Sequence, residues 1–166
     1  MAKIAVVMGS DSDYEVVKKG LDILKKFEIS CDVRLISAHR TPAEAEEFAR
    51  NAEANGMELI IAAAGKAAHL AGVMAGISPL PVIGIPIKTS MMGGLDSLLS
   101  VVQMPKGVPV ATVAVDGAEN AALLAVQILS VKYPELREKI IAYKEEMRAD
   151  ILAKDVKMAE ETKQYL

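Results

Sequence analysis

The sequence predicts an α/β fold in which a doubly wound parallel sheet of five strands lies between two layers of helices. The first observation is that short apolar runs alternate five times with longer segments of helical periodicity. The second is a composition of 52% hydrophobic but only 4% aromatic residues, typical of the aliphatic core of a parallel sheet buried on both faces. The third is the length of 166 residues, which suits one domain with a substantial core.

Each expected strand is an apolar run, and an expected helix follows each one. The strands are expected at Ile4 to Met8, Val33 to Ile36, Leu59 to Ala63, Pro81 to Ile87 and Pro109 to Val115. The helices are expected at Asp13 to Phe27, Pro42 to Asn55, Ala67 to Ile77, Leu95 to Gln103 and Glu119 to Val131. Crossovers in such sheets are right-handed, so the loops after the strands meet at one edge, where these folds bind ligands.

The loop after the first strand, Gly9 to Asp13, places small and polar residues at the expected start of a helix. Gly9 allows a tight turn, and Ser10 or Ser12 can cap the helix. Hydroxyl and backbone N–H groups at such a position also bind phosphate, and a carboxylate such as that of Asp13 accepts hydrogen bonds from ribose hydroxyls. The loop has neither a Walker A nor a GxGxxG motif, so helix capping alone remains an alternative.

The loop after the second strand, Ser37 to Pro42, carries the strongest chemical signal. Thr41 and Glu44 have the spacing of a capping box, with proline at the first helical position, so a helix is expected to begin just after His39 and Arg40. An imidazole and a permanent cation then lie at the positive end of a helix dipole. This pair predicts a site that binds an anion and moves a proton. The alternative is a salt bridge for Arg40 and simple packing for His39.

Three further loops are expected at the same edge, and we expect all five to converge on one pocket. The third, Ala63 to Gly72, is rich in small residues that let a ligand approach the backbone, and it holds Lys66 and the second histidine, His69. Lys66 is either a solvated charge or a second cation for the ligand, and His69 is either a ligand contact or a helix residue bonded across an interface. The fourth loop, Lys88 to Ser97, has paired glycines and can fold over a bound molecule. The fifth is Asp116 to Asn120.

The chain changes character after residue 133. An apolar stripe at spacings of three and four lies among alternating charges and predicts a long amphipathic helix; its members are Leu136, Ile140, Tyr143, Met147 and Ile151. We expect residues 1–133 to form the α/β catalytic domain and residues 134–166 to pack on a neighbouring subunit. Docking of this helix on its own domain is the alternative.

Composition excludes several classes of protein. The net charge of −3 argues against a nucleic-acid-binding stripe or a surface attracted to membranes. Cys31 is the only cysteine, which excludes a disulfide framework within the chain and a thiolate metal cluster and suits a reducing compartment. The first apolar run is too short for an export signal or a membrane span. We therefore expect a soluble, cytoplasmic protein.

Several motifs in order resemble one known family. They are Met8-Gly9-Ser10-Asp11-Ser12-Asp13, Ser37 to Pro42, Ala67-Ala68-His69-Leu70, Gly94 to Leu98, Val102 to Pro105 and Asn120 to Leu124. Over residues 3–150 the chain resembles the 5-(carboxyamino)imidazole ribonucleotide mutases of purine biosynthesis, the class I PurE family. The resemblance implies a flavodoxin-like domain, a homo-octamer with sites shared between subunits, and conversion of 5-(carboxyamino)imidazole ribonucleotide into 4-carboxy-5-aminoimidazole ribonucleotide without ATP, metal or biotin.

The resemblance also assigns roles to residues at matching positions. Ser10 and Asp13 are expected to hold the phosphate and ribose of the nucleotide, Arg40 its phosphate end, and His39 is expected to be the catalytic acid and base, with His69 beside the substrate. The other expected substrate-binding residues are Gly9, Ser12, Ser37, Gly65, Lys66 and Leu70. The chain departs from the family pattern at Lys66, where a second glycine is usual, and at Ala71, where proline is usual.

Two other functions remain open from the sequence. One is the class II reaction, direct carboxylation of aminoimidazole ribonucleotide with carbon dioxide; those relatives lack the Ala-Ala-His-Leu run, so its retention favours the mutase. The other is a non-catalytic nucleotide- or flavin-binding module, because a fold alone does not establish a function. Aromatic residues that stack on a flavin are scarce, with no tryptophan in the chain, although Tyr14 is available.

Overall fold

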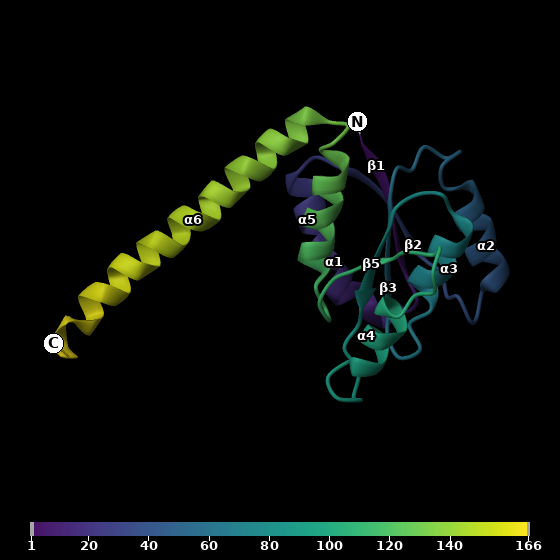
Figure 1. Cartoon of the computed structure of the whole chain (residues 1–166), viewed down its shortest axis with the longest axis horizontal. Helices are drawn as coiled ribbons and strands as arrows, with labels where there is room; N and C mark the ends of the chain where they lie inside the picture. Colours follow the sequence, from purple (N-terminus) through teal and green to yellow (C-terminus); the bar gives the residue numbers. More distant parts are fainter. Residues whose placement is uncertain (1, 166) are drawn as a thin grey trace.

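The computed structural model describes residues 2–165 and shows one parallel sheet with helices on both faces (Figure 1). The strands are β1 Lys3–Met8, β2 Ser30–Leu35, β3 Ile60–Ala64, β4 Val82–Pro86 and β5 Ala111–Thr112. The helices are α1 Tyr14–Lys26, α2 Pro42–Asn51, α3 Leu70–Ile77, α4 Leu95–Val102, α5 Ala118–Leu129 and α6 Pro134–Thr162, with short 3-10 turns at Asp11–Asp13 and Lys163–Tyr165.

The strand order is β2-β1-β3-β4-β5, and every neighbouring pair is parallel. This is the flavodoxin-like order, so the predicted fold class is confirmed. The chain runs from β1 outward to β2 and then returns past β1 to β3. Ligands in such sheets bind outside the carboxyl ends of the strands, where this reversal leaves a crevice.

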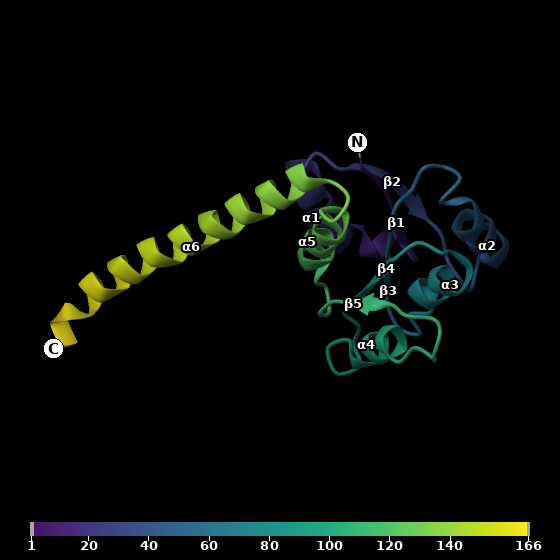
Figure 2. The same cartoon turned by 45° about the horizontal axis from the view of Figure 1, so that its top comes forward.

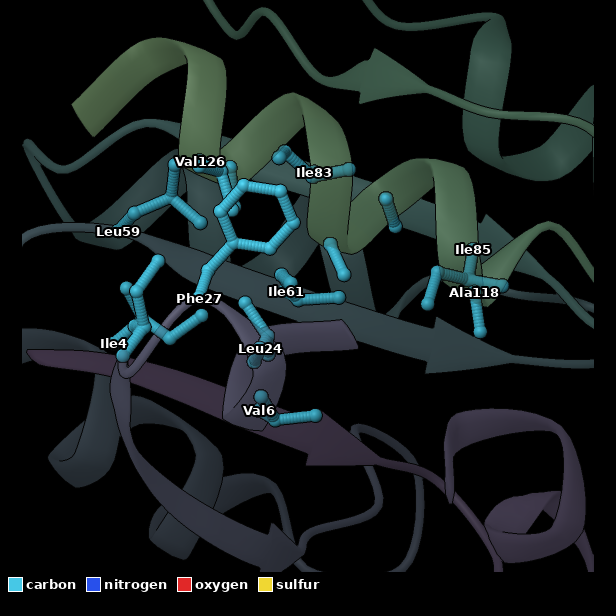
Figure 3. Close-up of a cluster of buried hydrophobic side chains, with 14 of the residues drawn as sticks. Ile4, Val6, Leu24, Phe27, Leu59, Ile61, Ile83, Ile85, Ala118 and Val126 are labelled. Atoms are coloured by element: carbon cyan, nitrogen blue, oxygen red, sulfur yellow. The ribbon is translucent and has the colours of Figure 1, made fainter. Parts of the chain in front are cut away.

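Residues that alternate along each strand build two separate apolar layers. Ile4 and Val6 of β1 pack under α1 and α5, whereas Ala5 and Val7 face the layer of α2, α3 and α4. Figure 3 shows the first layer, in which Phe27 at the end of α1 lies among aliphatic side chains of the strands and of α5. Both faces of the central strands are therefore buried, as the aliphatic composition predicts.

The backbone of α1 approaches the start of α5 closely at Gly20. A Cβ atom added there would lie 2.7 Å from the carbonyl oxygen of Ala118, which is shorter than a real carbon–oxygen contact. Only glycine fits without a shift of one helix. This contact fixes α1, whose first turn lies beside the loop that follows β1.

Four elements differ from their expected bounds by three or more residues at one end. Strand β2 begins at Ser30 rather than Val33, and α2 ends at Asn51 rather than Asn55; the other two are β5 and α3. The regular ladder of the fifth strand covers only Ala111 and Thr112, and Pro109 before it has no N–H to donate. Beyond the ladder, single backbone hydrogen bonds from Val113 to Gly84 at 3.2 Å and from Asp116 to Pro86 at 2.9 Å continue the contact with β4. Helix α3 begins at Leu70 rather than Ala67. The φ of 57° at Lys66 is incompatible with a right-handed helix, and hydrogen bonds between residues two apart form tight turns before α3.

Helix α6 leaves the domain as a single arm (Figures 1 and 2). Leu136 and Ile140 are buried against the domain, and Tyr143 packs edge-on against Phe27 at 5.8 Å between ring centroids. Farther along the same stripe, Met147 and Ile151 are exposed by 45% and 63%. The start of the helix thus docks on its own domain, while the rest of the stripe has no cover from it. No helix in residues 2–165 combines the length and apolarity needed to cross a membrane.

Candidate active site

A cavity of about 970 Å³ lies at the carboxyl ends of the strands, within the size range of small-molecule sites. It is lined by the loops that follow β1, β2, β3 and β4. All of the site residues predicted from the sequence line it: Gly9, Ser10, Ser12, Asp13, Ser37, His39, Arg40, Gly65, Lys66, His69 and Leu70. The structure therefore brings these residues together, and their individual roles remain predictions.

The loop after β1 is preorganised by its own side chains. The Ser10 hydroxyl accepts a hydrogen bond from the Ser12 N–H at 3.3 Å, and the Asp13 carboxylate accepts one from the Ser10 N–H at 3.2 Å. This is a capping box at the 3-10 turn, so the expected capping by Ser10 is observed. Burial raises the pKa of Asp13, although hydrogen bonds from Ser12 and Ser10 oppose the rise. The carboxylate is thus held in place, and burial disfavours its charge.

The expected capping box of α2 does not form. The Thr41 hydroxyl accepts a hydrogen bond from the Ser37 N–H at 2.9 Å and donates one to the Ser37 carbonyl at 3.0 Å, and it makes no cap bond to the helix. The hydroxyl closes the loop instead, because both Ser37 groups are within its reach. The closed loop holds His39 and Arg40 just before the start of α2, where both line the cavity.

Arg40 joins the first two loops. Its Nη2 donates to the Gly9 carbonyl at 2.8 Å, and its Nε donates to the Ser37 hydroxyl at 3.4 Å. The guanidinium is therefore oriented by neutral groups rather than neutralised by a carboxylate. A cation held in this way remains available to an anionic ligand in the cavity.

The two histidines of the chain are in direct contact. His39 Nε2 and His69 Nδ1 lie 2.9 Å apart, and the rings meet at 74° with centroids 5.0 Å apart. One hydrogen is shared between these nitrogens, so one imidazole donates while the other accepts. The contact links the second loop to the third across the end of β1. A pair of imidazoles open to a cavity is well suited to proton transfer.

The fourth loop contributes side chains that the sequence did not single out. Lys88, Thr89, Ser90 and Asp96 also line the cavity, and the Thr89 hydroxyl donates to the Asp96 carboxylate at 2.6 Å. This hydrogen bond is the main reason that the pKa of Asp96 lies below its usual value, and the positive charge of Lys66 adds to the effect. The signal in the sequence was the glycine pair, which predicted a loop that covers a ligand but not these contacts.

The fifth loop does not line the cavity, so the expected convergence of five loops is wrong. Asp116 turns toward the fourth loop, where its carboxylate accepts a hydrogen bond from the Lys88 N–H at 2.8 Å. The reason is the strand order, which places β5 at the far edge of the sheet. The fifth loop supports the fourth rather than contacting the cavity.

Two other kinds of chemistry find little support in the described residues. Burial raises the pKa of the Cys31 thiol to about 11, so the thiol stays protonated at neutral pH and is a poor nucleophile. Within residues 2–165, no group of three or more His, Cys, Asp or Glu side chains is arranged to hold a metal ion.

Comparison with known proteins agrees with the geometry. The profile of the AIR carboxylase family matches residues 3–150. The N5-carboxyaminoimidazole ribonucleotide mutase of Pyrococcus abyssi is 57% identical over 89% of this chain and 85% of that protein, and the mutase of that name from Thermotoga maritima is 54% identical over 93% and 90%. The crystal structure of Treponema denticola PurE superimposes with a TM-score of 0.87 at 30% identity, covering 95% of this chain and 98% of that one. The predicted resemblance is confirmed, and the chain belongs to the AIR carboxylase family.

Proposed function

We propose that this protein is an isomerase of purine biosynthesis that converts 5-(carboxyamino)imidazole ribonucleotide into 4-carboxy-5-aminoimidazole ribonucleotide. The contact between His39 and His69 carries this proposal, because two imidazoles within hydrogen-bond distance are suited to proton transfer and they line the same cavity as the oriented guanidinium of Arg40. The names of the relatives that are about half identical support the same reaction.

The substrate is a phosphorylated nucleotide, and the first two loops offer matching groups. Arg40 binds the phosphate end, together with the Ser10 hydroxyl and the N–H groups of the capped turn. Asp13 accepts hydrogen bonds from ribose hydroxyls, which replace the solvent that its burial excludes. The heterocycle then lies toward His39 and His69, which line the same cavity.

The reaction moves a carboxylate from an exocyclic nitrogen to carbon 4 of an electron-rich imidazole. His39 donates a proton to the carbamate nitrogen, the C–N bond breaks, and carbon dioxide and aminoimidazole ribonucleotide remain together in the cavity. Carbon 4 attacks the carbon dioxide, and His39 takes the proton that carbon 4 loses. With Nε2 held by His69, Nδ1 is the nitrogen that exchanges these protons. Confinement of carbon dioxide next to carbon 4 supplies a proximity effect.

Replacement of His39 tests this role. His39→Asn should lower kcat by roughly 10² to 10⁴, the usual contribution of positioned acid–base catalysis, while nucleotide affinity changes by less than about threefold. Turnover would be followed with the carbamate substrate, and affinity by calorimetry with the product. Turnover within about tenfold of the wild type would remove His39 from the chemistry.

The direct carboxylase is the second enzyme hypothesis, and the substrate that each enzyme requires separates the two. Product formation from the carbamate in buffer depleted of carbon dioxide identifies a mutase. Product formation only from aminoimidazole ribonucleotide plus bicarbonate identifies the carboxylase. The relatives described above carry the name of the mutase, which favours the first outcome. A purified protein that binds flavin and is yellow would instead favour the non-catalytic module.

We also propose that the protein works in the cytoplasm as a homo-octamer whose subunits share the sites. On α4, an apolar stripe is exposed at Leu95, Leu99 and Val102, by 36%, 46% and 47%. Asp96 of the same helix lines the cavity, so a subunit that covers this stripe would border the site. The exposed end of the α6 stripe offers a second apolar contact. Met147→Glu combined with Ile151→Glu should reduce the molar mass in light scattering, and an unchanged mass would count against this use of α6.

A further inference from the structure

Lys66 adopts a backbone conformation that its side chain disfavours. It lines the cavity with φ of 57°, a left-handed conformation in which the Cβ of an L-residue crowds the backbone and which glycine adopts freely. Strain of this kind at a ligand cavity suggests that the side chain has a use there. The side chain supplies an ammonium group on a flexible stem.

The strand order separates this cation from Arg40. Arg40 follows β2 and is bonded to the loop after the neighbouring β1. Lys66 follows β3, and its carbonyl accepts a hydrogen bond from the hydroxyl of Ser100 in α4 at 3.5 Å, on the side of β4. The imidazole contact spans the two regions. The cavity thus has Arg40 toward the β2 side and Lys66, with Lys88 from the loop after β4, toward the other side. The imidazole pair lies between the loops that carry Arg40 and Lys66.

The ammonium group of Lys66 is not neutralised by the neighbouring carboxylate of Asp96. The positive charge of Lys66 acts on Asp96, whose carboxylate accepts a hydrogen bond from the Thr89 hydroxyl at 2.6 Å. Lys66 acts on Asp96 only through space, and these two described side chains form no ion pair. An ammonium that is near a cavity but not in an ion pair can bind a ligand anion.

We propose that Lys66 binds the carboxylate that substrate and product both carry, and that it thereby makes the site specific for carboxylated nucleotides. This assignment rests on the proposed mutase function, which places the phosphate at Arg40 and leaves the other anionic group for the opposite end. The carboxylate moves between adjacent atoms of the heterocycle. A single ammonium on a four-carbon stem can follow it, whereas a rigid guanidinium fork suits one geometry.

The test compares two nucleotides that differ only in the carboxylate. Calorimetry with 4-carboxy-5-aminoimidazole ribonucleotide should show affinity about three- to tenfold weaker for Lys66→Gln than for the wild type, as expected for a charge-assisted contact open to solvent. Affinity for aminoimidazole ribonucleotide should stay within about twofold. In turnover, KM should rise while kcat stays within about threefold, because the contact exists in substrate and product alike.

Three further variants isolate the charge. Lys66→Arg should keep most of the preference for the carboxylated nucleotide. Lys66→Gly should lose the preference as Lys66→Gln does, and because glycine relieves the backbone strain, misfolding cannot account for that loss. Lys106→Gln makes the same change in net charge at an exposed turn that does not line the cavity, and it should leave both affinities unchanged.

Other results would overturn the assignment. Equal weakening of both nucleotides would place Lys66 at the phosphate or ribose, and unchanged affinity for both would make it a solvated charge. If the wild type binds both nucleotides equally well, the site does not recognise the carboxylate at all, although the mutase reaction can still stand. If the wild type binds neither nucleotide, the proposed function falls, and this assignment falls with it.

Discussion

His69 lies one hydrogen bond away from the proposed catalytic imidazole, and its replacement should slow the reaction without preventing substrate binding. His39 Nε2 and His69 Nδ1 are 2.9 Å apart. When His39 carries its second proton, its Nε2–H can donate to the lone pair on His69 Nδ1. His69 then stabilises the protonated acid and holds the ring in place. His69→Phe removes this bond and keeps a planar ring of similar size.

The size of the effect follows from the change in His39 during the reaction. A hydrogen bond between neutral groups contributes about 0.5–1.5 kcal/mol, and one to a charged group about 1.5–3 kcal/mol. Only the difference, about 1–1.5 kcal/mol, distinguishes the two protonation states of His39, and each 1.36 kcal/mol is a factor of ten in rate. The difference favours the step in which His39 accepts the proton of carbon 4, since this step forms the charged imidazole. We therefore expect His69→Phe to slow this step about tenfold and to lower kcat accordingly, with KM within about threefold.

Two amide variants of His69 test whether a hydrogen-bonding atom at the position of Nδ1 is sufficient for the effect. The amide of asparagine can occupy the place of the histidine Nδ1, whereas that of glutamine reaches the place of Nε2. His69→Asn should therefore keep kcat within about threefold of the wild type, and His69→Gln should resemble His69→Phe. Steady-state assays with the carbamate substrate, combined with product affinity by calorimetry, measure both effects. Equal rates for the two amide variants, or a His69→Phe rate within twofold of the wild type, would refute a role for the Nδ1 contact.

Two predictions concern the stability of the fold that carries the site. Gly20→Ala should destabilise the protein by about 1 kcal/mol or more, because overpacking costs about 1–3 kcal/mol and exceeds the gain in helix propensity. Gly76→Ala is the control in α3: an added Cβ there meets only Val108 at 4.0 Å, so this variant should not be destabilised. Urea unfolding of both variants measures the difference. Burial opposes ionisation of Glu58, but hydrogen bonds from Lys132 at 2.6 Å and from a tyrosine hydroxyl outweigh it and lower the pKa of Glu58 below 4.5. Below about pH 4.5 the folded state therefore binds fewer protons than the unfolded state. The stability advantage of the wild type over Glu58→Gln, measured by urea unfolding, should be complete above about pH 4.5 and should shrink as the pH falls below it. An advantage that does not change with pH would contradict this.

The fold was predictable because the pattern along the chain matches the layers of the sheet. Runs such as Ile4 to Met8 are buried on both faces, and each is followed by a helix, which leaves few possible topologies. The limits of β5 and α3 were not predictable in the same way. The ladder of β5 stops at Thr112 although the apolar run continues to Val115, and the start of α3 depends on the left-handed backbone of Lys66. Neither conformation follows from hydrophobic periodicity.

The site was predictable at the level of loops and less so at the level of contacts. Polar residues after a strand indicate a ligand site, whichever hydrogen bonds they make, so Ser10 and Arg40 were found from position alone. Thr41 shows the limit of this reasoning. A hydroxyl before a helix can cap the helix or close its own loop, and here the Ser37 backbone groups lie within its reach. Thr89 and Asp96 were missed because a glycine-rich loop resembles a mobile lid.

The contact between the histidines needs information that no local pattern holds. His39 follows β2 and His69 follows β3, and β1 lies between these strands. Neighbouring strands lie about 4.8 Å apart, so the two loops start about 10 Å from each other, and two imidazoles that reach inward can close this distance. The contact between them therefore lies over the end of β1. A strand order and two histidines from distant loops thus make the site together, and the sequence shows the residues without showing that they meet.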